Sequence, residues 1–395
     1  MEYFFKFFGR KSRRFLVAVL VILTGFSVLT CDSQEIVFEV PSEPRPFAEL
    51  SATELVANIK IGWNLGNTLD ASGSETSWGN PVTTKANITA IKNAGFNAIR
   101  IPVTWSKATN SKYAIKDSWM ARVVQVVNYA VDNDMYIILN THHDEKIFKF
   151  TNANTEKSLK AFEKIWKQIA GTFKNYDEKL IFEGLNEPRT KDSSNEWSGG
   201  TVEEHNNLKR HYQIFVDTVR ASGGNNDKRI LMVNTYAASG EVAAINGLVI
   251  PNDISGSGKI IASIHSYAPF NFALNANPVG TKNSVDTWSK SESLDTSAIR
   301  DPIDLVYNKF VANSIPVIIG EFGALSKNND ATRAEWAEYY VNYAMSKGIP
   351  CFWWDNGILS GNGDIFAIFN RRTNTVSSLQ IVNALMRGLA DWTAP

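Results

Sequence analysis

Short apolar runs alternate with amphipathic segments along most of the chain, and this alternation constrains the fold more than any other feature. Segments with apolar residues at helical spacing separate the runs, as expected for strands that are joined by crossover helices. Strands and helices in strict alternation form a parallel sheet, and eight units favour closure into a (β/α)8 TIM barrel, an α/β fold. The eight runs begin near Ile61, Ala98, Met135, Leu180, Ile230, Ile260, Pro316 and Pro350.

Some helix boundaries between these runs can be predicted from capping residues and prolines. Thr201 and Glu204 have the spacing of a capping box, in which each side chain binds the other residue's backbone N–H. Proline is tolerated in the first turn of a helix, so Pro302 predicts a helix that begins at Asp301. Further predicted helices begin at Asp117 and Asp330.

Residues 1–31 have the pattern of a signal peptide. Basic residues in Lys6–Arg14 precede the apolar run Phe15–Leu29. This run is shorter than the ~20 residues that span a bilayer comfortably. Cys31 follows directly and resembles a loose bacterial lipoprotein site, in which the cysteine is lipidated. An ordinary signal peptide that is cut nearby is the alternative. We expect an exported bacterial protein, either secreted or anchored at the cell surface or outer membrane through Cys31.

The rest of the chain is expected to hold one domain. Residues 32–48 form a predicted extended linker, because Pro41, Pro44 and Pro46 favour an extended backbone. No shift in composition divides residues 49–395, which we assign to the barrel domain. Cys351 lies in an apolar run, so we expect a buried, inert thiol. The 395 residues carry a formal net charge of zero, which gives no indication of nucleic-acid binding.

Two glutamates stand where predicted strands end. The run Leu180–Phe182 leads to Asn186-Glu187-Pro188, and proline cannot continue a central strand. The run from Pro316 leads to Glu321, which lies near glycines that let a ligand approach closely. Loops that follow barrel strands build one face, so strands 4 and 7 bring both carboxylates to the same mouth. Two carboxylates at one site are the minimal requirement for hydrolysing a glycosidic bond.

These motifs resemble the two catalytic motifs of glycoside hydrolase family 5, in particular its endoglucanase and xyloglucanase branch, subfamily 4. The resemblance runs from about residue 50 to the C-terminus in the family's own order. It implies a retaining endo-β-1,4-glucanase for cellulose-like, mixed-linkage or xyloglucan polysaccharides. We expect a monomer without cofactor or metal. Further matching segments are Gly62–Asp70, Ser77–Pro81, Ile99–Trp105, Asn140–Asp144 and Phe352–Asn356.

The resemblance also implies roles for individual side chains. Glu187 is expected to be the acid/base and Glu321 the nucleophile. We expect cationic or donor neighbours to keep Glu321 ionised, and a less favourable site for charge to keep Glu187 protonated. Arg100, in the second strand, would hold Glu321 ionised, and Tyr267 would donate to it. Glu183 lies inside its strand and is better explained as a structural ion-pair member.

Further candidates lie next to the carboxylates. Asn186 could bind the sugar 2-hydroxyl or support the turn before Pro188. Three of the five histidines, His142, His143 and His265, follow predicted strands, which is an informative concentration. The resemblance implies that His142 lies beside the reacting sugar and His265 near the carboxylates. The other two, which fall on a helix, are predicted bystanders: His205 and His211.

Substrate-binding candidates are chosen by their positions in loops or at strand ends. The chain has 11 tryptophans, whose rings can fill a core or stack against sugar faces. Tryptophans in polar loops are harder to explain by packing, and Trp354 resembles the platform under the sugar at the cleavage site. Asn67 could equally be a turn residue. The candidates are Asn64, Asn67, Trp78, His143, Trp197, Trp288 and Trp354.

Other functions must be weighed against this interpretation. The same fold could be specific for xyloglucan, xylan or mannan. The segment His142–Glu145, with His265 and Glu321, could suggest a metal-dependent hydrolase, but adjacent histidines on a strand point to opposite faces. A non-catalytic glycan-binding lipoprotein would be expected to lack one acidic partner, and both are present.

Overall fold

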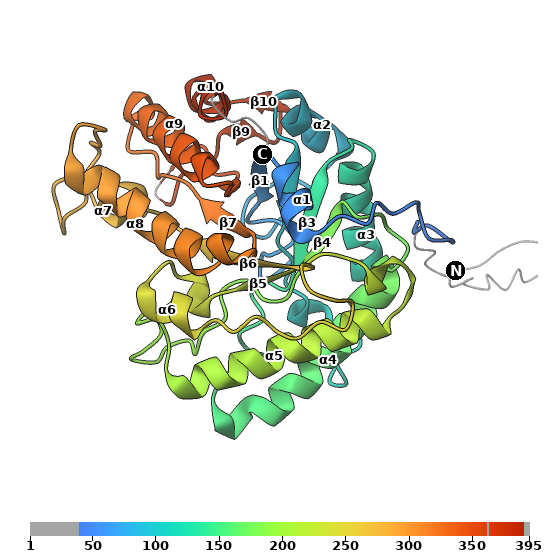
Figure 1. Cartoon of the computed structure of the whole chain (residues 1–395). Coiled ribbons are helices and arrows are strands. Elements are labelled where there is room, and N and C mark those ends of the chain that lie inside the picture. Colours follow the sequence, from blue (N-terminus) through green and yellow to red (C-terminus); the bar gives the residue numbers. More distant parts are fainter. Residues whose placement is uncertain (1–38, 362, 391–395) are drawn as a thin grey trace, which may run out of the picture. The chain divides into compact units, whose positions relative to one another are not determined.

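The eight predicted runs form parallel strands that close into a barrel in sequence order, with β8 pairing back onto β1 (Figure 1). The computed structural model describes residues 39–361 and 363–390, so the predicted signal peptide and Cys31 lie outside the described residues. The (β/α)8 barrel is thereby confirmed. The strands are β1 (Ile61–Leu65), β2 (Ala98–Ile101), β3 (Tyr136–Asn140), β4 (Leu180–Glu183), β5 (Leu231–Asn234), β6 (Ile260–His265), β7 (Val317–Phe322) and β8 (Cys351–Asp355).

Helices surround the strands, with α4 and α5 side by side on one flank of the barrel (Figure 1). The helices are α1 (Ala52–Ala57), α2 (Lys85–Asn93), α3 (Asp117–Val131), α4 (Asn152–Phe173), α5 (Val202–Ala221), α6 (Val242–Gly247), α7 (Phe270–Ala273), α8 (Ser293–Lys309), α9 (Asp330–Ser346) and α10 (Leu379–Arg387). Short 3-10 turns are η1 (Ser106–Ala108), η2 (Gly224–Asp227), η3 (Tyr236–Ala238) and η4 (Val311–Asn313). A hairpin pairs β9 (Phe369–Asn370) with β10 (Thr375–Val376).

The helix starts agree with the sequence in part. Thr201 and Glu204 form the predicted capping box of α5. Helices α3 and α9 begin at Asp117 and Asp330, as predicted, although the cap residue of α3 is Lys116, which makes no side-chain hydrogen bond. The predicted start at Asp301 is wrong, since α8 begins at Ser293 and contains Pro302 in its interior. The buried apolar face of α8 packs on both sides of this proline, so tertiary contacts outweigh one lost backbone hydrogen bond.

The floor of the barrel is closed by α1. Its Leu55 and Val56, with Ile59, belong to one buried cluster with the strand residues Ile138 and Ile181. Their burial removes apolar surface from water at the end of the barrel where the strands begin. The loops that follow the strands at the opposite end are therefore left to form a site.

Residues 39–48, which we call the strap, are held against this floor. The Arg45 N–H donates to the carbonyl of Asn175 at 2.9 Å. The Asn175 side chain donates to the carbonyl of Pro41 at 2.8 Å, and Asn225 donates to the carbonyl of Arg45 at 2.9 Å. The linker expected over residues 32–48 is thus, from residue 39 onward, attached to the barrel.

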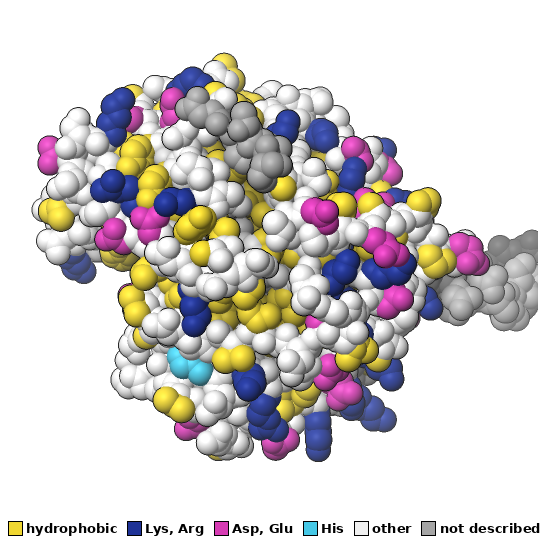
Figure 2. Space-filling model, viewed as in Figure 1, with side chains coloured by type: hydrophobic (Ala, Val, Ile, Leu, Met, Phe, Trp, Pro, Cys, Tyr) yellow, Lys and Arg dark blue, Asp and Glu magenta, His cyan; other side chains and the backbone are white. Residues whose placement is uncertain are grey.

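Cys351 is fully buried in β8, as predicted. Basic and acidic side chains are interspersed on the face shown in Figure 2, in keeping with the balanced net charge. Within residues 39–361 and 363–390, none of the helices has the length and apolar character needed to cross a membrane.

Candidate active site

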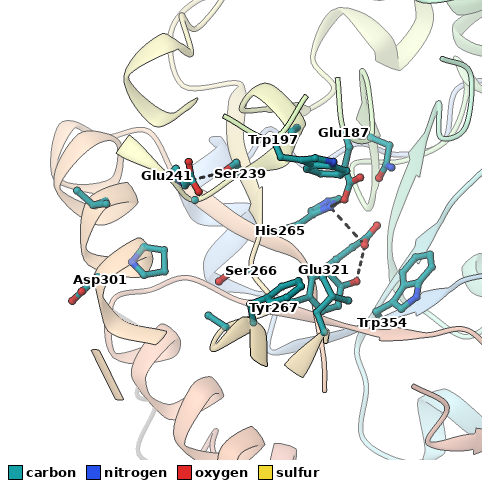
Figure 3. Close-up of a pocket in the computed structure, with 18 of the residues that line it drawn as sticks. Glu187, Trp197, Ser239, Glu241, His265, Ser266, Tyr267, Asp301, Glu321 and Trp354 are labelled. Atoms are coloured by element: carbon teal, nitrogen blue, oxygen red, sulfur yellow. Dashed lines mark hydrogen bonds and ion pairs between the residues drawn. The ribbon is translucent and has the colours of Figure 1, made fainter. Parts of the chain in front are cut away.

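A cavity of about 940 Å³ lies at the mouth where the strands end, and both predicted glutamates line it. Glu187 follows β4, and Glu321 lies near the end of β7. Oxygens of the two carboxylates lie within 4.8 Å of each other and of a ring nitrogen of His265 (Figure 3). Retaining glycosidases hold their carboxyl groups roughly 5 Å apart, whereas inverting enzymes need about 6.5–9.5 Å to admit a water.

Arg100 fixes one of these carboxylates from within the barrel. Its Nη1 donates to Glu321 Oε1 at 2.6 Å and to Asn64 Oδ1 at 3.0 Å. Its Nε and Nη2 bind both oxygens of Glu183 at 2.7 and 3.0 Å, the structural ion pair expected for that residue. Burial disfavours the guanidinium charge, but Glu183 and Glu321 outweigh burial and raise the pKa of Arg100. Arg100 therefore stays cationic and places a positive charge against the Glu321 carboxylate.

Tyr267 and His265 complete the surroundings of the pair. The Tyr267 hydroxyl donates to Glu321 Oε2 at 2.8 Å, the bond expected from the sequence. Burial and the charge of Glu321 raise the pKa of this phenol well above its usual value, so it remains a donor. His265 Nδ1 lies 3.0 Å from Glu187 Oε1 and 3.6 Å from Glu321 Oε2. One imidazole thus lies between the two carboxylates.

The environment of Glu187 differs from the one predicted. Burial opposes ionisation, but the hydrogen bond and charge of His265, followed by the charges of Arg189 and His143, lower the pKa of Glu187. The prediction that its site disfavours charge is therefore wrong for the ligand-free protein. Arg189 directly follows Pro188, and the sequence does not indicate that this cation lies beside Glu187.

A group of aromatic rings stands near the two carboxylates. The ring of His142 is parallel to that of Trp354, with centres 5.9 Å apart. Burial, with the charges of His143 and Arg100, lowers the pKa of His142 well below its usual value, so this ring is neutral. Trp78 is 36% exposed, and its ring centre lies 5.8 Å from that of His143. These four candidates therefore lie together.

Trp197 lies on the Glu187 side of the carboxylate pair. It is 60% exposed and lines the cavity close to Glu187, whereas Trp354 lies beyond Glu321 (Figure 3). An exposed ring, Trp197, and a half-buried ring, Trp354, therefore line the cavity on the two sides of the carboxylate pair.

Two predicted substrate contacts are wrong. Asn64 is fully buried, and its amide donates to the backbone carbonyl of Gly320 at 3.0 Å while its oxygen accepts from Arg100. It therefore supports the site from behind. Trp288 is 4% exposed and packs against Tyr339 with ring centres 5.3 Å apart. A polar loop sequence did not reveal that neighbouring helices cover this ring.

Asn67 combines the two uses left open for it. Its backbone is left-handed, with φ of 56°, and its N–H donates to Asp70 Oδ2 at 2.9 Å. It is therefore a turn residue. It also lines a second cavity of about 380 Å³ beside Trp354.

Sequence reasoning missed Asn234 and Arg189. The buried Asn234 amide donates to Glu183 Oε1 at 2.5 Å and to the carbonyls of Leu185 and Asn186 at 2.6 Å. Asn234 ends β5, so the signal that identified the glutamates, a polar residue closing an apolar run, was present. Arg189 directly follows Pro188 and carried no separate signal.

Two clusters of potential metal ligands occur in the described part of the chain, each with ligand atoms within 4.8 Å: Asp70, His142 and His143, and Glu187, His265 and Glu321. The prediction that His142 and His143 point to opposite faces of a strand is wrong. The strand β3 ends at Asn140, so both residues follow it, and their ring centres lie 4.5 Å apart. At Glu321 a metal ion would be repelled by Arg100, only 2.6 Å from that carboxylate.

A closed (β/α)8 barrel whose mouth holds two carboxylates at this separation defines a glycoside hydrolase with retaining geometry. Comparison with known families agrees, since the family described as Cellulase (glycosyl hydrolase family 5) matches residues 64–360. The chain therefore belongs to glycoside hydrolase family 5.

Relatives support this assignment. Cellulase/esterase CelE of Acetivibrio thermocellus is 45% identical over 93% of this chain, which spans 43% of that longer protein. Endoglucanase A of Clostridium longisporum is 40% identical, with 95% of this chain and 73% of the relative covered. A family 5, subfamily 4 broad-specificity endoglucanase from Ruminococcus champanellensis, solved with bound cellotriose, has a TM-score of 0.82 at 44% identity, covering 87% and 100%. A family 5 lichenase from a Caldicellulosiruptor species, in complex with cellotetraose, has a TM-score of 0.82 at 41% identity, covering 89% and 98%.

Proposed function

We propose that this chain is a retaining endo-β-1,4-glucanase that hydrolyses internal bonds of β-glucans by double displacement. The observation that carries the proposal is the separation of Glu187 and Glu321, whose oxygens lie within 4.8 Å. That spacing leaves room for direct attack by one carboxylate on the sugar and none for an intervening water. Arg100 and Tyr267 both bind Glu321, which supports its assignment as the ionised nucleophile.

In the first half of the reaction, a carboxylate oxygen of Glu321 attacks the anomeric carbon. The bond from that carbon to the glycosidic oxygen breaks, and Glu187 gives its proton to the departing oxygen. In the second half, Glu187 removes a proton from water, and the water oxygen displaces Glu321 from the anomeric carbon. Both carboxyl groups then return to their initial forms.

Glu187 has to carry a proton when the substrate reacts. The bound sugar removes water that would otherwise solvate a second negative charge, while Glu321 remains ionised beside it. Both changes favour the neutral form of Glu187. We therefore expect substrate binding to raise the pKa of Glu187 from its low value in the free protein.

Asn186 is proposed to bind the sugar 2-hydroxyl. Arg100 Nη2 donates to Asn186 Oδ1 at 2.6 Å, which orients the amide and leaves its NH2 group available to the cavity that Asn186 lines. Such a bond strengthens as positive charge develops at the neighbouring carbon. His142 and Trp354 are proposed to contact the sugar whose anomeric carbon is attacked by Glu321.

The proposed substrates are β-1,4-glucans and mixed-linkage glucans. The exposed Trp197 near Glu187 and the half-buried Trp354 beyond Glu321 both line the cavity, which suits a chain that runs through it. Broad-specificity endoglucanases and a lichenase are among the similar structures. Specificity for xyloglucan, xylan or mannan is the alternative, because branches and epimeric hydroxyls are distinguished by loop contacts.

Product analysis on a panel of purified polysaccharides tests this function. We expect the mean chain length of carboxymethylcellulose and mixed-linkage glucan to fall early, before short sugars accumulate. Release of one short product from the start, or activity on mannan or xylan alone, would refute the proposal. Full activity after dialysis against a chelator is also expected, and its loss would favour the metal-dependent alternative.

We further propose that the chain is exported and acts as a monomer, with Cys31 as the lipidated N-terminus. The basic and apolar pattern of residues 1–31 supports export. Mass spectrometry of the mature N-terminus distinguishes a lipidated Cys31 from a free N-terminus cut nearby. Light scattering of the purified protein gives the oligomeric state.

A further inference from the structure

The Arg189 side chain contacts both the backbone and the side chain of Glu187, the acid/base candidate. Its Nη1 donates to the backbone carbonyl of Glu187 at 3.0 Å and to Glu187 Oε2 at 3.3 Å. Its side chain is 9% exposed, so water does not screen this contact strongly. Glu187 is therefore held by His265 at one carboxylate oxygen and by Arg189 at the other.

The same guanidinium fixes the loop that follows β4. Arg189 Nε donates to Glu196 Oε1 at 2.8 Å, and Glu196 Oε2 accepts the Asp192 N–H at 2.8 Å. The ring of Trp197 lies over the guanidinium at 4.5 Å, within the range of a cation–π contact. Figure 3 shows this ring beside Glu187 and away from Trp354.

Three carboxylates share the charge of Arg189. Besides Glu187 and Glu196, Glu145 Oε1 lies 4.0 Å from Nη1. Burial opposes ionisation of Glu145, but the hydrogen bond and charge of His143, with the charge of Arg189, lower its pKa to about 2. Two ionised partners thus remain when Glu187 is neutral. A largely buried arginine with Glu187 as its sole partner would be left uncompensated each time that residue took up a proton.

We propose that Arg189 is a positioning residue that orients Glu187 for proton transfer and connects it to the Trp197 loop on the leaving-group side of the cavity. The inference rests on the proposed function, in which Glu187 is the acid/base. Glu187 donates to the oxygen that departs, so a ring close to Glu187 and distant from Trp354 faces the departing sugar. The guanidinium of Arg189 then positions both the Trp197 ring, on which the departing sugar stacks, and the Glu187 carboxyl, which donates the proton.

The variant Arg189→Met tests this role because it keeps an unbranched stem and removes the guanidinium with its charge and donors. We expect kcat/KM on cellotetraose to fall by about 10²-fold, the low end of what acid–base catalysis contributes. A dinitrophenyl cellobioside, whose leaving group needs little protonation, should react nearly as fast in its first half as with the unaltered enzyme. Stoichiometric labelling by a 2-fluoro cellobioside shows that the variant retains a folded site.

The pH profile provides a second readout that a merely structural role would not move. The charged and titratable groups that face Glu187 are His265, Arg189, His143, Tyr267 and Glu321. Removing the cation disfavours ionised Glu187, so the basic limb of kcat/KM should move to higher pH in Arg189→Met. Arg189→Lys keeps the charge and should keep the limb in place.

Two controls separate the possible outcomes. Glu196→Gln should raise KM for longer oligosaccharides while leaving the basic limb unmoved. Arg210→Met removes an exposed arginine whose ion pair with Glu156 lies on the helices, and it should change neither readout. Equal losses of Arg189→Met on both substrates with an unmoved limb would overturn the proposal for Arg189. If Glu187→Ala also showed no dependence on the leaving group, the proposed function itself would fail.

Discussion

At the scale of single residues, the site depends on how completely Arg100 is used. Its hydrogen bonds to Glu183, Glu321, Asn64 and Asn186 engage Nε and both terminal nitrogens. A guanidinium presents its donors as a rigid planar fork, whereas a lysine offers one mobile ammonium. Arg100 can therefore orient Glu321 and Asn186 together, so the nucleophile and the proposed 2-hydroxyl contact are placed by one side chain.

Glu321→Gln removes the nucleophile with little change in volume. We expect turnover of β-glucan to fall by roughly four to six orders of magnitude, the scale seen for loss of a catalytic nucleophile. Binding should persist, because the rest of the cavity is unchanged. Affinity electrophoresis in polysaccharide gels, alongside initial rates, checks both expectations. Near-normal turnover would reject the assignment of Glu321.

Glu187→Ala removes the proton donor and leaves the nucleophile. We expect kcat/KM on unactivated glucans to fall by about 10²–10⁴-fold. Aryl cellobiosides with acidic leaving groups should be cleaved much better than glucans by this variant, since their bonds break without protonation. The rates are compared across a series of aryl leaving groups. A uniform loss across that series would contradict an acid role for Glu187.

Part of the site could be predicted from residues alone. Glu187 and Glu321 were found because each interrupts an apolar run at a strand end, and the barrel brings such ends together. Asn64 and Trp288 could not be placed, because burial depends on elements distant in sequence. The lowered pKa of Glu187 also depends on His265, which is 78 positions away and approaches only in the folded chain.

At the scale of elements, α4 and α5 enclose a neutral histidine. His211 Nε2 lies 2.8 Å from Ser158 Oγ on α4, and Nδ1 lies 2.8 Å from the carbonyl oxygen of Asn207. Burial, partly offset by that carbonyl, lowers the pKa of His211 to about 4. The sequence predicts that His211 takes no part in catalysis. Its contacts give it a structural role between two helices.

This histidine predicts a loss of stability in acid. In the unfolded chain the imidazole has an ordinary pKa near 6.5, so protonation favours unfolding below that value. The contribution is present above pH ~6.5 and is lost as pH falls toward 4, by about 3 kcal/mol in total. Denaturant titrations from pH 4 to 7 should give a shallower pH dependence for His211→Gln than for the unaltered chain.

Comparison with the variant is needed because Asp144 acts in the opposite sense. Burial, against hydrogen bonds from Ser106 and Trp105, raises the pKa of this carboxyl to about 6. Its neutral form therefore stabilises the fold at low pH, and that contribution is lost as pH rises toward 6. Only the difference between the two chains isolates His211. Identical slopes would contradict the assigned role.

At the scale of the whole molecule, the barrel separates stability from chemistry. The alternation of apolar runs with amphipathic segments was sufficient to predict eight strands and their order. Strands that alternate with helices pair in parallel, and eight such units favour a closed barrel. The strap could not be foreseen, since a proline-rich segment gives no pattern that shows what it will contact. Its partners Asn175 and Asn225 lie at the floor, far from the cavity residues along each βα unit.

Removing the strap should therefore destabilise the protein without changing its chemistry. A chain that begins at residue 49 loses several hydrogen bonds worth about 0.5–1.5 kcal/mol each, so we expect a lower free energy of unfolding by about 2–4 kcal/mol. The kcat at 25 °C should be unchanged. A chain that begins at residue 39 is the control. A fall in kcat with unaltered stability would contradict this separation.

The strap also decides from which side the polypeptide reaches the enzyme. Because the Asn128 side chain on α3 donates to the carbonyl of Glu39, this end of the strap is held to the barrel away from the cavity. A pull applied at Glu39 would therefore act on the floor, and the open end would stay free. Long polymers could then thread past the two acids without meeting the strap.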